Sequence, residues 1–328
     1  MIDQYPEAEE VYCDEFYNLY RSLKGGSGVP TFIIPPFAGR KGRVVLPLIK
    51  KCEKTGRPVW WYELKSATQA TKNLDVAGLI SILRQSTDII TNCCSTDKID
   101  VVGTCQGGWL AALFTSFYPE RVRKLAAFVA PINLKTGQKN AIESYCETIS
   151  LPAHKMLVDL NSGIQPGLAQ WLAFASMAPM QVFYGRYLDL LGHVVNDRPA
   201  GIEKWGVNEG WYDDPNDLAG VWFLDVLENH FAKNRLYDGT WNIGGQVADL
   251  GNITCPVYVF AGGKDDITST KQALDLLKKV GSVEKHGVIF PEAGHTRAFT
   301  GAAELDEFAE MFLHEKYVQV PEVAEEWI

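Results

Sequence analysis

The sequence predicts an α/β fold in which a mostly parallel central sheet is covered by helices on both faces. Short apolar runs rich in β-branched and aromatic residues alternate with longer helical patterns along most of the chain. These runs are apolar at consecutive positions, which is typical of strands that are buried on both faces. At 328 residues, the chain has a suitable length for one such domain that carries an insertion.

The predicted elements follow one another in the order that a parallel sheet requires. The core strands are predicted at 31–35, 59–64, 99–103, 125–130, 257–261 and 287–290. Helical patterns lie between or after them, at 76–92, 107–118, 270–280 and 303–313. The residues from 318 to the end are predicted to be loosely attached.

The regular alternation stops after Pro131 and resumes only near Ile253. The intervening segment is helical in pattern and rich in tryptophan. An insertion at this place in an α/β fold usually covers the carboxyl ends of the strands, where ligands bind. We therefore expect a core formed by residues 1–132 and 242–328, and a helical cap formed by residues 133–241 that lies over the site with an apolar inner face.

Composition and charge exclude several classes of function. The formal net charge of −9 and the absence of a basic cluster argue against a nucleic-acid partner. The acidic start of the chain differs from a secretory signal, so we expect a cytoplasmic protein. Its seven cysteines have neither a disulfide-like nor a zinc-site spacing, which predicts reduced thiols and no metal. The longest apolar stretch, 168–183, is too short and too interrupted to cross a membrane.

The segment 101–109 contains a pattern typical of a nucleophile elbow. Gly103 and Gly107 flank Cys105, with a predicted strand before them and a predicted helix after them. The glycines permit a very tight turn, and the central side chain is held above the sheet. The positive end of the helix favours a thiolate. This arrangement predicts an α/β-hydrolase fold with Cys105 as its nucleophile, whereas the alternative is a small buried cysteine in a glycine-rich turn.

The remaining catalytic groups are expected at later strand ends, in the order nucleophile, acid, histidine. His295 follows a glycine after the last predicted strand, and the five other histidines lie at positions typical of surface or core roles. Asp265 is preferred to Asp266 as the acid because it stands at the turn itself. A helix cap or turn residue is the alternative for either aspartate.

The oxyanion of the reaction is expected to bind two backbone N–H groups. One is that of Gln106, directly after the nucleophile. The other belongs to Phe37 or Ala38, in the loop after the first predicted core strand.

On these residues the chain resembles the polyhydroxyalkanoate synthases and, slightly less, the intracellular polyhydroxybutyrate depolymerases. The box at 103–108 is similar to the synthase box Gly-x-Cys-x-Gly-Gly, and the segments 211–220, 234–239, 243–245 and 249–256 are similar to the synthase stretch that leads to the catalytic aspartate. The segments 265–268 and 294–301 instead resemble depolymerases, and the segments 35–42 and 293–296 depart from synthases. The resemblance implies that Cys105 is acylated, Asp265 is the acid and His295 is the base.

The resemblance implies acyl transfer on 3-hydroxyacyl thioesters or esters through an acyl-cysteine, with no cofactor. One alternative is hydrolysis by the same triad, as in a depolymerase, carboxylic ester hydrolase or thioesterase. The other is a catalytically silent protein that binds polymer granules. Expected partners are 3-hydroxyacyl-coenzyme A or a polyester, the granule surface, and a second copy or a partner subunit. Trp109, Trp171 and Trp211 are predicted to contact substrate, although aromatic residues in a cap also serve ordinary core packing.

Overall fold

The structure, a computed structural model, describes residues 5, 7–37, 43–138, 140–177, 184–199, 201–202, 205 and 215–314. Within them, an eight-stranded sheet has the strand order β1-β2-β4-β3-β5-β6-β11-β12. The strands are β1 (Ala8–Cys13), β2 (Tyr17–Ser22), β3 (Thr31–Ile34), β4 (Val59–Leu64), β5 (Ile99–Thr104), β6 (Val122–Phe128), β11 (Val257–Gly262) and β12 (Lys285–Phe290). β1, β2 and β4 pair antiparallel, and all other neighbours pair parallel. The predicted mostly parallel sheet is confirmed.

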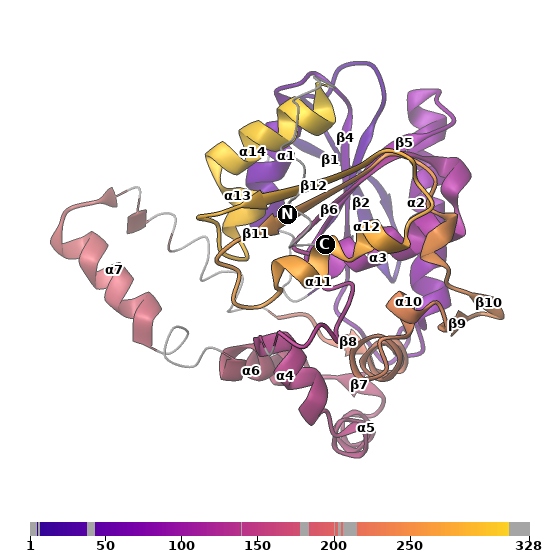
Figure 1. The fold of residues 1–328 in the computed structure, drawn as a ribbon, viewed down its shortest axis with the longest axis vertical. Helices are drawn as coiled ribbons and strands as arrows, with labels where there is room; N and C mark the ends of the chain where they lie inside the picture. Colours follow the sequence, from indigo (N-terminus) through magenta and orange to yellow (C-terminus); the bar gives the residue numbers. More distant parts are fainter. Residues whose placement is uncertain are drawn as a thin grey trace.

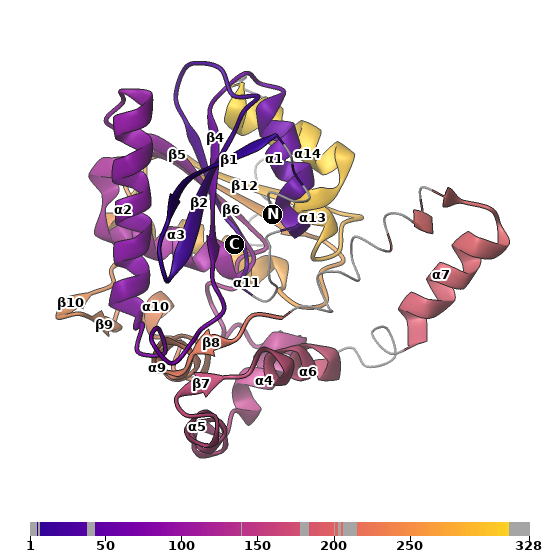
Figure 2. The ribbon, with the colours of Figure 1, turned by 180° about the vertical axis from the view of Figure 1, so that it is seen from behind.

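Helices cover both faces of this sheet (Figures 1 and 2). One face packs against α2 (Val76–Cys94), α3 (Gln106–Phe117), α11 (Thr270–Leu274) and α12 (Leu276–Lys279). The other packs against α1 (Leu46–Glu53), α13 (Arg297–Thr300), α14 (Ala302–Phe308) and the π-helix Ala309–Leu313. Short 3-10 helices lie at Arg43–Val45, Pro119–Arg121 and Leu250–Asn252. Every residue of β3, β5 and β11 is buried, as their continuous apolar pattern requires.

Some elements differ from the sequence prediction. The antiparallel strands β1 and β2 and the helix α1 were not predicted. The helix predicted over 270–280 is interrupted at Asp275, whose buried carboxylate accepts a 2.6 Å hydrogen bond from Asn133 Nδ2. The helix predicted over 303–313 becomes a π-helix after Phe308.

The chain between β6 and β11 holds mostly helices. They are α4 (Ala141–Thr148), α5 (Leu151–Leu160), α6 (Gly167–Met177), α7 (Arg186–Val195), α9 (Gly220–Asp225), the π-helix Val226–Ala232 and α10 (Arg235–Asp238). Two short antiparallel pairs join them, β7 (Ile164–Gln165) with β8 (Leu218–Ala219) and β9 (Asn242–Ile243) with β10 (Gln246–Val247). Figure 1 shows α4, α5 and α6 gathered at one end of the sheet, while α7 extends away from the rest of the molecule.

Hydrogen bonds between buried or partly buried polar groups hold this segment to the sheet region. Asn234 Nδ2 donates to Asn133 Oδ1 at 3.0 Å, which links the end of the segment to its beginning. Asp217 N donates to Ser66 Oγ at 3.0 Å, and Ala67 N donates to Asp217 O at 2.9 Å. Because Ser66 and Ala67 follow β4 directly, β8 is fixed beside the end of a core strand.

Candidate active site

Cys105 lies between the end of β5 and the start of α3, in a backbone conformation that is rare for a residue with a side chain. Its φ is 52° and its ψ is −118°. The conformation is held in place because Cys105 N donates to Phe128 O at 2.8 Å, which extends the pairing of β5 with β6 by one residue. The tight turn puts the sulfur at the N-terminus of the 12-residue helix α3.

The two flanking glycines are required by close backbone approaches. A Cβ atom at Gly107 would overlap the carbonyl oxygen of Ile34, and one at Gly103 would overlap the carbonyl oxygen of Gly107. The strand, turn and helix therefore pack as the glycine pattern in the sequence indicates.

His295 and Asp265 come from the loops after the two neighbouring strands β12 and β11. Oδ2 of Asp265 accepts a 2.8 Å hydrogen bond from Nδ1 of His295. Oδ1 of the same carboxylate accepts from the backbone N–H groups of Ile267 and Thr268, both at 2.9 Å. The Asp265 carboxylate is fully buried, whereas Asp266 is exposed. Asp265 is therefore held rigidly and fixes the orientation of the imidazole.

Cys105 and Asp265 both influence the pKa of His295. Burial lowers this pKa, but the negative charges of Cys105 and of Asp265 and the hydrogen bond to Asp265 raise it, and the outcome is a pKa well above the ordinary value. Nε2 of His295 is buried and makes no hydrogen bond to any described residue, so it is free to take up a proton. The imidazole can thus exchange a proton with the sulfur while Asp265 stabilises its charged form.

The predicted oxyanion site is only partly open. The backbone N–H of Gln106 belongs to the first turn of α3, where helix geometry provides no intrahelical acceptor. The backbone N–H of Phe37 donates instead to Gln106 Oε1, at 3.0 Å. An oxyanion would have to displace this side-chain oxygen to use both donors. Ala38 lies outside the described residues.

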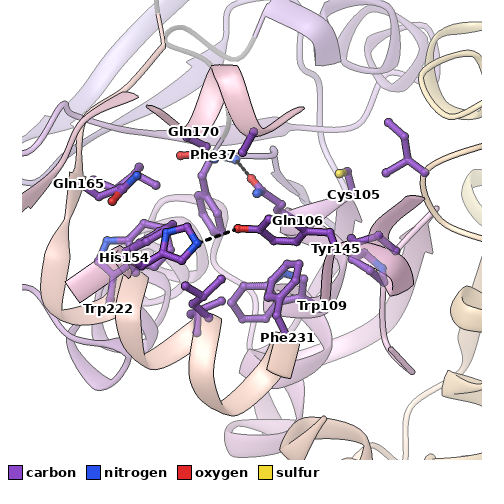
Figure 3. A pocket seen from close by; sticks show the side chains of 18 of the residues that line it. Phe37, Cys105, Gln106, Trp109, Tyr145, His154, Gln165, Gln170, Trp222 and Phe231 are labelled. Atoms are coloured by element: carbon purple, nitrogen blue, oxygen red, sulfur yellow. Dashed lines mark hydrogen bonds between the residues drawn. The ribbon is translucent and has the colours of Figure 1, made fainter. Parts of the chain in front are cut away.

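A pocket opens from Cys105 into the segment between β6 and β11 (Figure 3). It contains about 850 Å³ of space not filled by atoms, part of it open to solvent. Its described lining is mainly apolar, and no side chain in it is acidic or carries a Lys or Arg charge. The lining residues are Phe37, Cys105, Gln106, Trp109, Pro131, Ile142, Tyr145, His154, Gln165, Ala169, Gln170, Ala173, Leu218, Trp222, Phe223, Val226, Leu227, Phe231, Ile267 and Thr268.

The predicted substrate contacts fall in different places. Trp109 lines the pocket. Trp171 lies on α6 and is not among the residues that line it, although Gln170 and Ala173 of the same helix are. Trp211 lies outside the described residues.

Sequence reasoning did not find several residues of the pocket wall. His154, expected to have a surface or core role, faces the pocket, and its Nε2 lies 3.5 Å from the hydroxyl of Tyr145 (Figure 3). Trp222, Gln165 and Gln170 also line the pocket. No local pattern marks these residues, since they come from separate elements that only tertiary packing brings together.

The described residues contain neither a metal-binding cluster nor a membrane-spanning helix. No group of three or more His, Cys, Asp or Glu side chains there could hold a metal ion. No helix in the same ranges is long and apolar enough to cross a membrane.

Curated relatives of this chain are named poly(3-hydroxyalkanoate) polymerase subunits. The chain is 25% identical over 248 residues to the poly(3-hydroxyalkanoate) polymerase subunit PhaC of Allochromatium vinosum, covering 75% of this chain and 68% of that protein. It is 26% identical over 279 residues to the subunit of the same name from Synechocystis sp., covering 82% of this chain and 73% of that protein.

Similar solved structures share the fold. Mouse alpha/beta hydrolase domain-containing protein 10 aligns with a TM-score of 0.56 and 14% identity, over 94% of this chain and 97% of that one. Bacillus megaterium epoxide hydrolase aligns with a TM-score of 0.57 and 14% identity, over 92% and 99%. These likenesses confirm the α/β-hydrolase fold, and together with the curated relatives they indicate an enzyme of that superfamily.

A family profile with the description "Protein of unknown function (DUF3141)" matches residues 54–289, which is most of the chain. The chain is thus a polyhydroxyalkanoate-synthase-like α/β hydrolase that belongs to the DUF3141 family.

Proposed function

We propose that this protein transfers acyl groups of 3-hydroxyacyl thioesters or esters through a covalent acyl-Cys105 intermediate. The observation that carries the proposal is the placement of one sulfur. Cys105 stands at the start of α3, on the wall of an apolar pocket, and interacts with an imidazole that is bound to a buried carboxylate at 2.8 Å. A helix N-terminus and a neighbouring imidazolium both stabilise a thiolate, the reactive form of cysteine.

In the first half-reaction, Nε2 of His295 accepts the proton of the Cys105 thiol. The sulfur attacks the acyl carbon, and the carbonyl oxygen becomes an oxyanion near the backbone N–H groups of Gln106 and Phe37. For both N–H groups to bind the oxyanion, the hydrogen bond between Phe37 N–H and Gln106 Oε1 must break. The bond to the leaving thiolate or alkoxide then breaks, and His295 returns the proton to it.

In the second half-reaction, the acyl group leaves Cys105 for an acceptor. A hydroxyl group of another hydroxyacyl unit gives its proton to His295 and attacks the thioester, which lengthens the chain by one unit. If water takes the place of this hydroxyl, the same residues perform hydrolysis, as in a depolymerase or ester hydrolase. The names of the curated relatives and the mainly apolar lining of the pocket support transfer over hydrolysis, because an apolar pocket holds little water.

We further propose that residues 133–241 act as a cap on a core formed by 1–132 and 242–328. Cys105, Gln106 and Trp109 contribute to the pocket from the core, and α4, α5, α6 and α9 contribute the facing wall. This arrangement supports a role of the segment in binding the acyl group. The helix α7 extends away from the pocket and takes no part in its lining (Figure 1).

The test combines intact-protein mass spectrometry with product analysis. The protein is incubated with 3-hydroxybutyryl-coenzyme A and, separately, with amorphous polyhydroxybutyrate. We expect an acyl adduct that is absent from Cys105→Ala and unchanged in Cys93→Ala, a matched control because Cys93 is exposed on α2. Polymer formation supports transfer, and release of free hydroxy acid supports hydrolysis. An undiminished adduct in Cys105→Ala would refute the nucleophile, and a complete lack of adduct and product from both substrates would favour a silent, granule-binding protein.

A further inference from the structure

Two glutamines of the pocket wall have no hydrogen-bond partner for their amide oxygens. Gln165 is 2% exposed and Gln170 is 9% exposed, and both line the pocket that opens from Cys105. Oε1 of each is buried and accepts no hydrogen bond from the described part of the chain. A buried unpaired acceptor costs about 1–3 kcal/mol, so folded proteins keep few of them. Both acceptors are therefore available to a hydrogen-bond donor that enters the pocket.

The backbone around these glutamines is firmly held. Gln165 belongs to β7 and pairs with Leu218 of β8. The helix α6 that carries Gln170 begins at Gly167, whose N–H donates to Asp217 Oδ1 at 2.8 Å. The backbone N–H of Asp217 in turn donates a hydrogen bond to Ser66 Oγ, just after β4. The two amides are thus placed before a ligand arrives, as a binding site requires.

The chemistry around the glutamines favours an uncharged ligand group. Apart from Cys105, the titratable groups of the described wall are Tyr145 and His154. Burial raises the pKa of Tyr145 to about 12 and lowers the pKa of His154, so both side chains are neutral near pH 7. A carboxylate or ammonium would find no opposite charge among the described lining residues. A hydroxyl group is neutral and donates the hydrogen bond that an amide oxygen lacks.

The position of the glutamines indicates which part of a substrate they meet. Figure 3 shows Gln165 and Gln170 on the side of the pocket away from the sulfur of Cys105. An acyl group bound to Cys105 would place its carbonyl at the sulfur and its far end near the glutamines. The pocket lining as a whole is mainly apolar and suits the chain carbons.

We propose that Gln165 and Gln170 bind a hydroxyl group at the far end of the acyl chain, so that the pocket selects chains with a distal hydroxyl over plain alkyl chains of equal length. Such a hydroxyl occurs in an ω-hydroxyacyl group and at the free end of a short hydroxyacyl oligomer. This inference rests on the proposed attachment of the acyl group at Cys105, but the binding preference that it predicts does not require turnover.

The experiment measures binding to Cys105→Ala by titration calorimetry, with methyl hexanoate and methyl ω-hydroxyhexanoate as probes, and with the octanoate pair to vary the length. We expect the hydroxyl-bearing member of at least one pair to bind about 10- to 100-fold more tightly, as one or two hydrogen bonds to otherwise unpaired buried groups imply. Adding Gln165→Leu and Gln170→Leu should remove this preference and strengthen binding of the plain ester. Gln246→Leu, the same substitution at an exposed position of β10, should leave both affinities unchanged.

Equal binding within both pairs, or an undiminished preference after both glutamines are replaced, would overturn the inference. If the leucine variant fails to fold by circular dichroism, Gln165→Met and Gln170→Met, which keep an unbranched chain of similar length, take its place. The proposed function is tested separately by acyl-adduct formation in the protein with Cys105 intact. A distal-hydroxyl preference without any adduct would leave the binding inference standing and refute the acyl-cysteine mechanism.

Discussion

Replacing Asp265 by asparagine removes one negative charge from a buried network without changing its size. The carboxylate now accepts three hydrogen bonds, from His295 Nδ1 at 2.8 Å and from the N–H groups of Ile267 and Thr268 at 2.9 Å. An asparagine has only one acceptor oxygen, so its NH₂ group must face either the imidazole or the two backbone donors. In either orientation a buried donor loses its partner.

The magnitude follows from the contact that is lost. A hydrogen bond between charged groups contributes about 1.5–3 kcal/mol, and both partners are buried, so solvent screens this contact little. Since about 1.4 kcal/mol corresponds to a factor of ten in rate, kcat/KM for a thioester or ester substrate should fall about 10- to 150-fold. A wrong imidazole tautomer would deepen this loss. The pKa of His295 should also fall, because the Asp265 charge is one of the groups that raise it.

The assay compares kcat/KM of Asp265→Asn with that of the exposed neighbour variant Asp266→Asn, which should stay within about twofold of the parent protein because an exposed carboxylate contributes little. Circular dichroism shows whether both variants remain folded. A loss of activity in Asp266→Asn but not in Asp265→Asn would refute the role of the buried carboxylate and would move the acid by one residue.

Three further predictions concern the elbow and its histidine. Cys105→Ser should lower the pKa of His295, because the negative charge of the sulfur that raises this pKa disappears while the burial that lowers it remains. An NMR titration that shows a raised pKa would contradict the pairing of Cys105 with His295. Iodoacetamide should label Cys105 more slowly at pH 7 in His295→Ala than in the parent protein, because the sulfur loses the imidazole that accepts its proton. Equal rates at pH 7 would argue against the contact. Gly107→Ala should destabilise the fold by at least about 1–3 kcal/mol in urea unfolding, because its Cβ meets the Ile34 carbonyl, whereas Gly192→Ala on α7 has open space and should be neutral or stabilising.

The strand pattern is clearest in the sequence where both faces of a strand are buried. The central strands β3, β5 and β11 are buried along their whole length and stand out as apolar runs. The edge strand β1 is half exposed and carries Glu9 and Glu10, so it has no such run. Its place in the sheet depends on pairing with β2, which local sequence does not encode.

The amino-acid sequence alone determined the α/β fold, the elbow at Cys105 and the chain order of sulfur, aspartate and histidine as candidate catalytic groups. These are local signals, because a tight turn needs glycines at fixed spacing and each strand end is marked by its own residues. Only the tertiary structure decided that the N–H of Phe37 donates a hydrogen bond to Gln106 Oε1, and that Gln165 and Gln170 line the same pocket as Cys105. Sixty residues separate Cys105 from Gln165 in sequence. They line one pocket because the long segment after β6 packs near the end of β4, where Asp217 and Ser66 form a hydrogen bond. The hydrophobic periodicity of the sequence does not indicate such a bond.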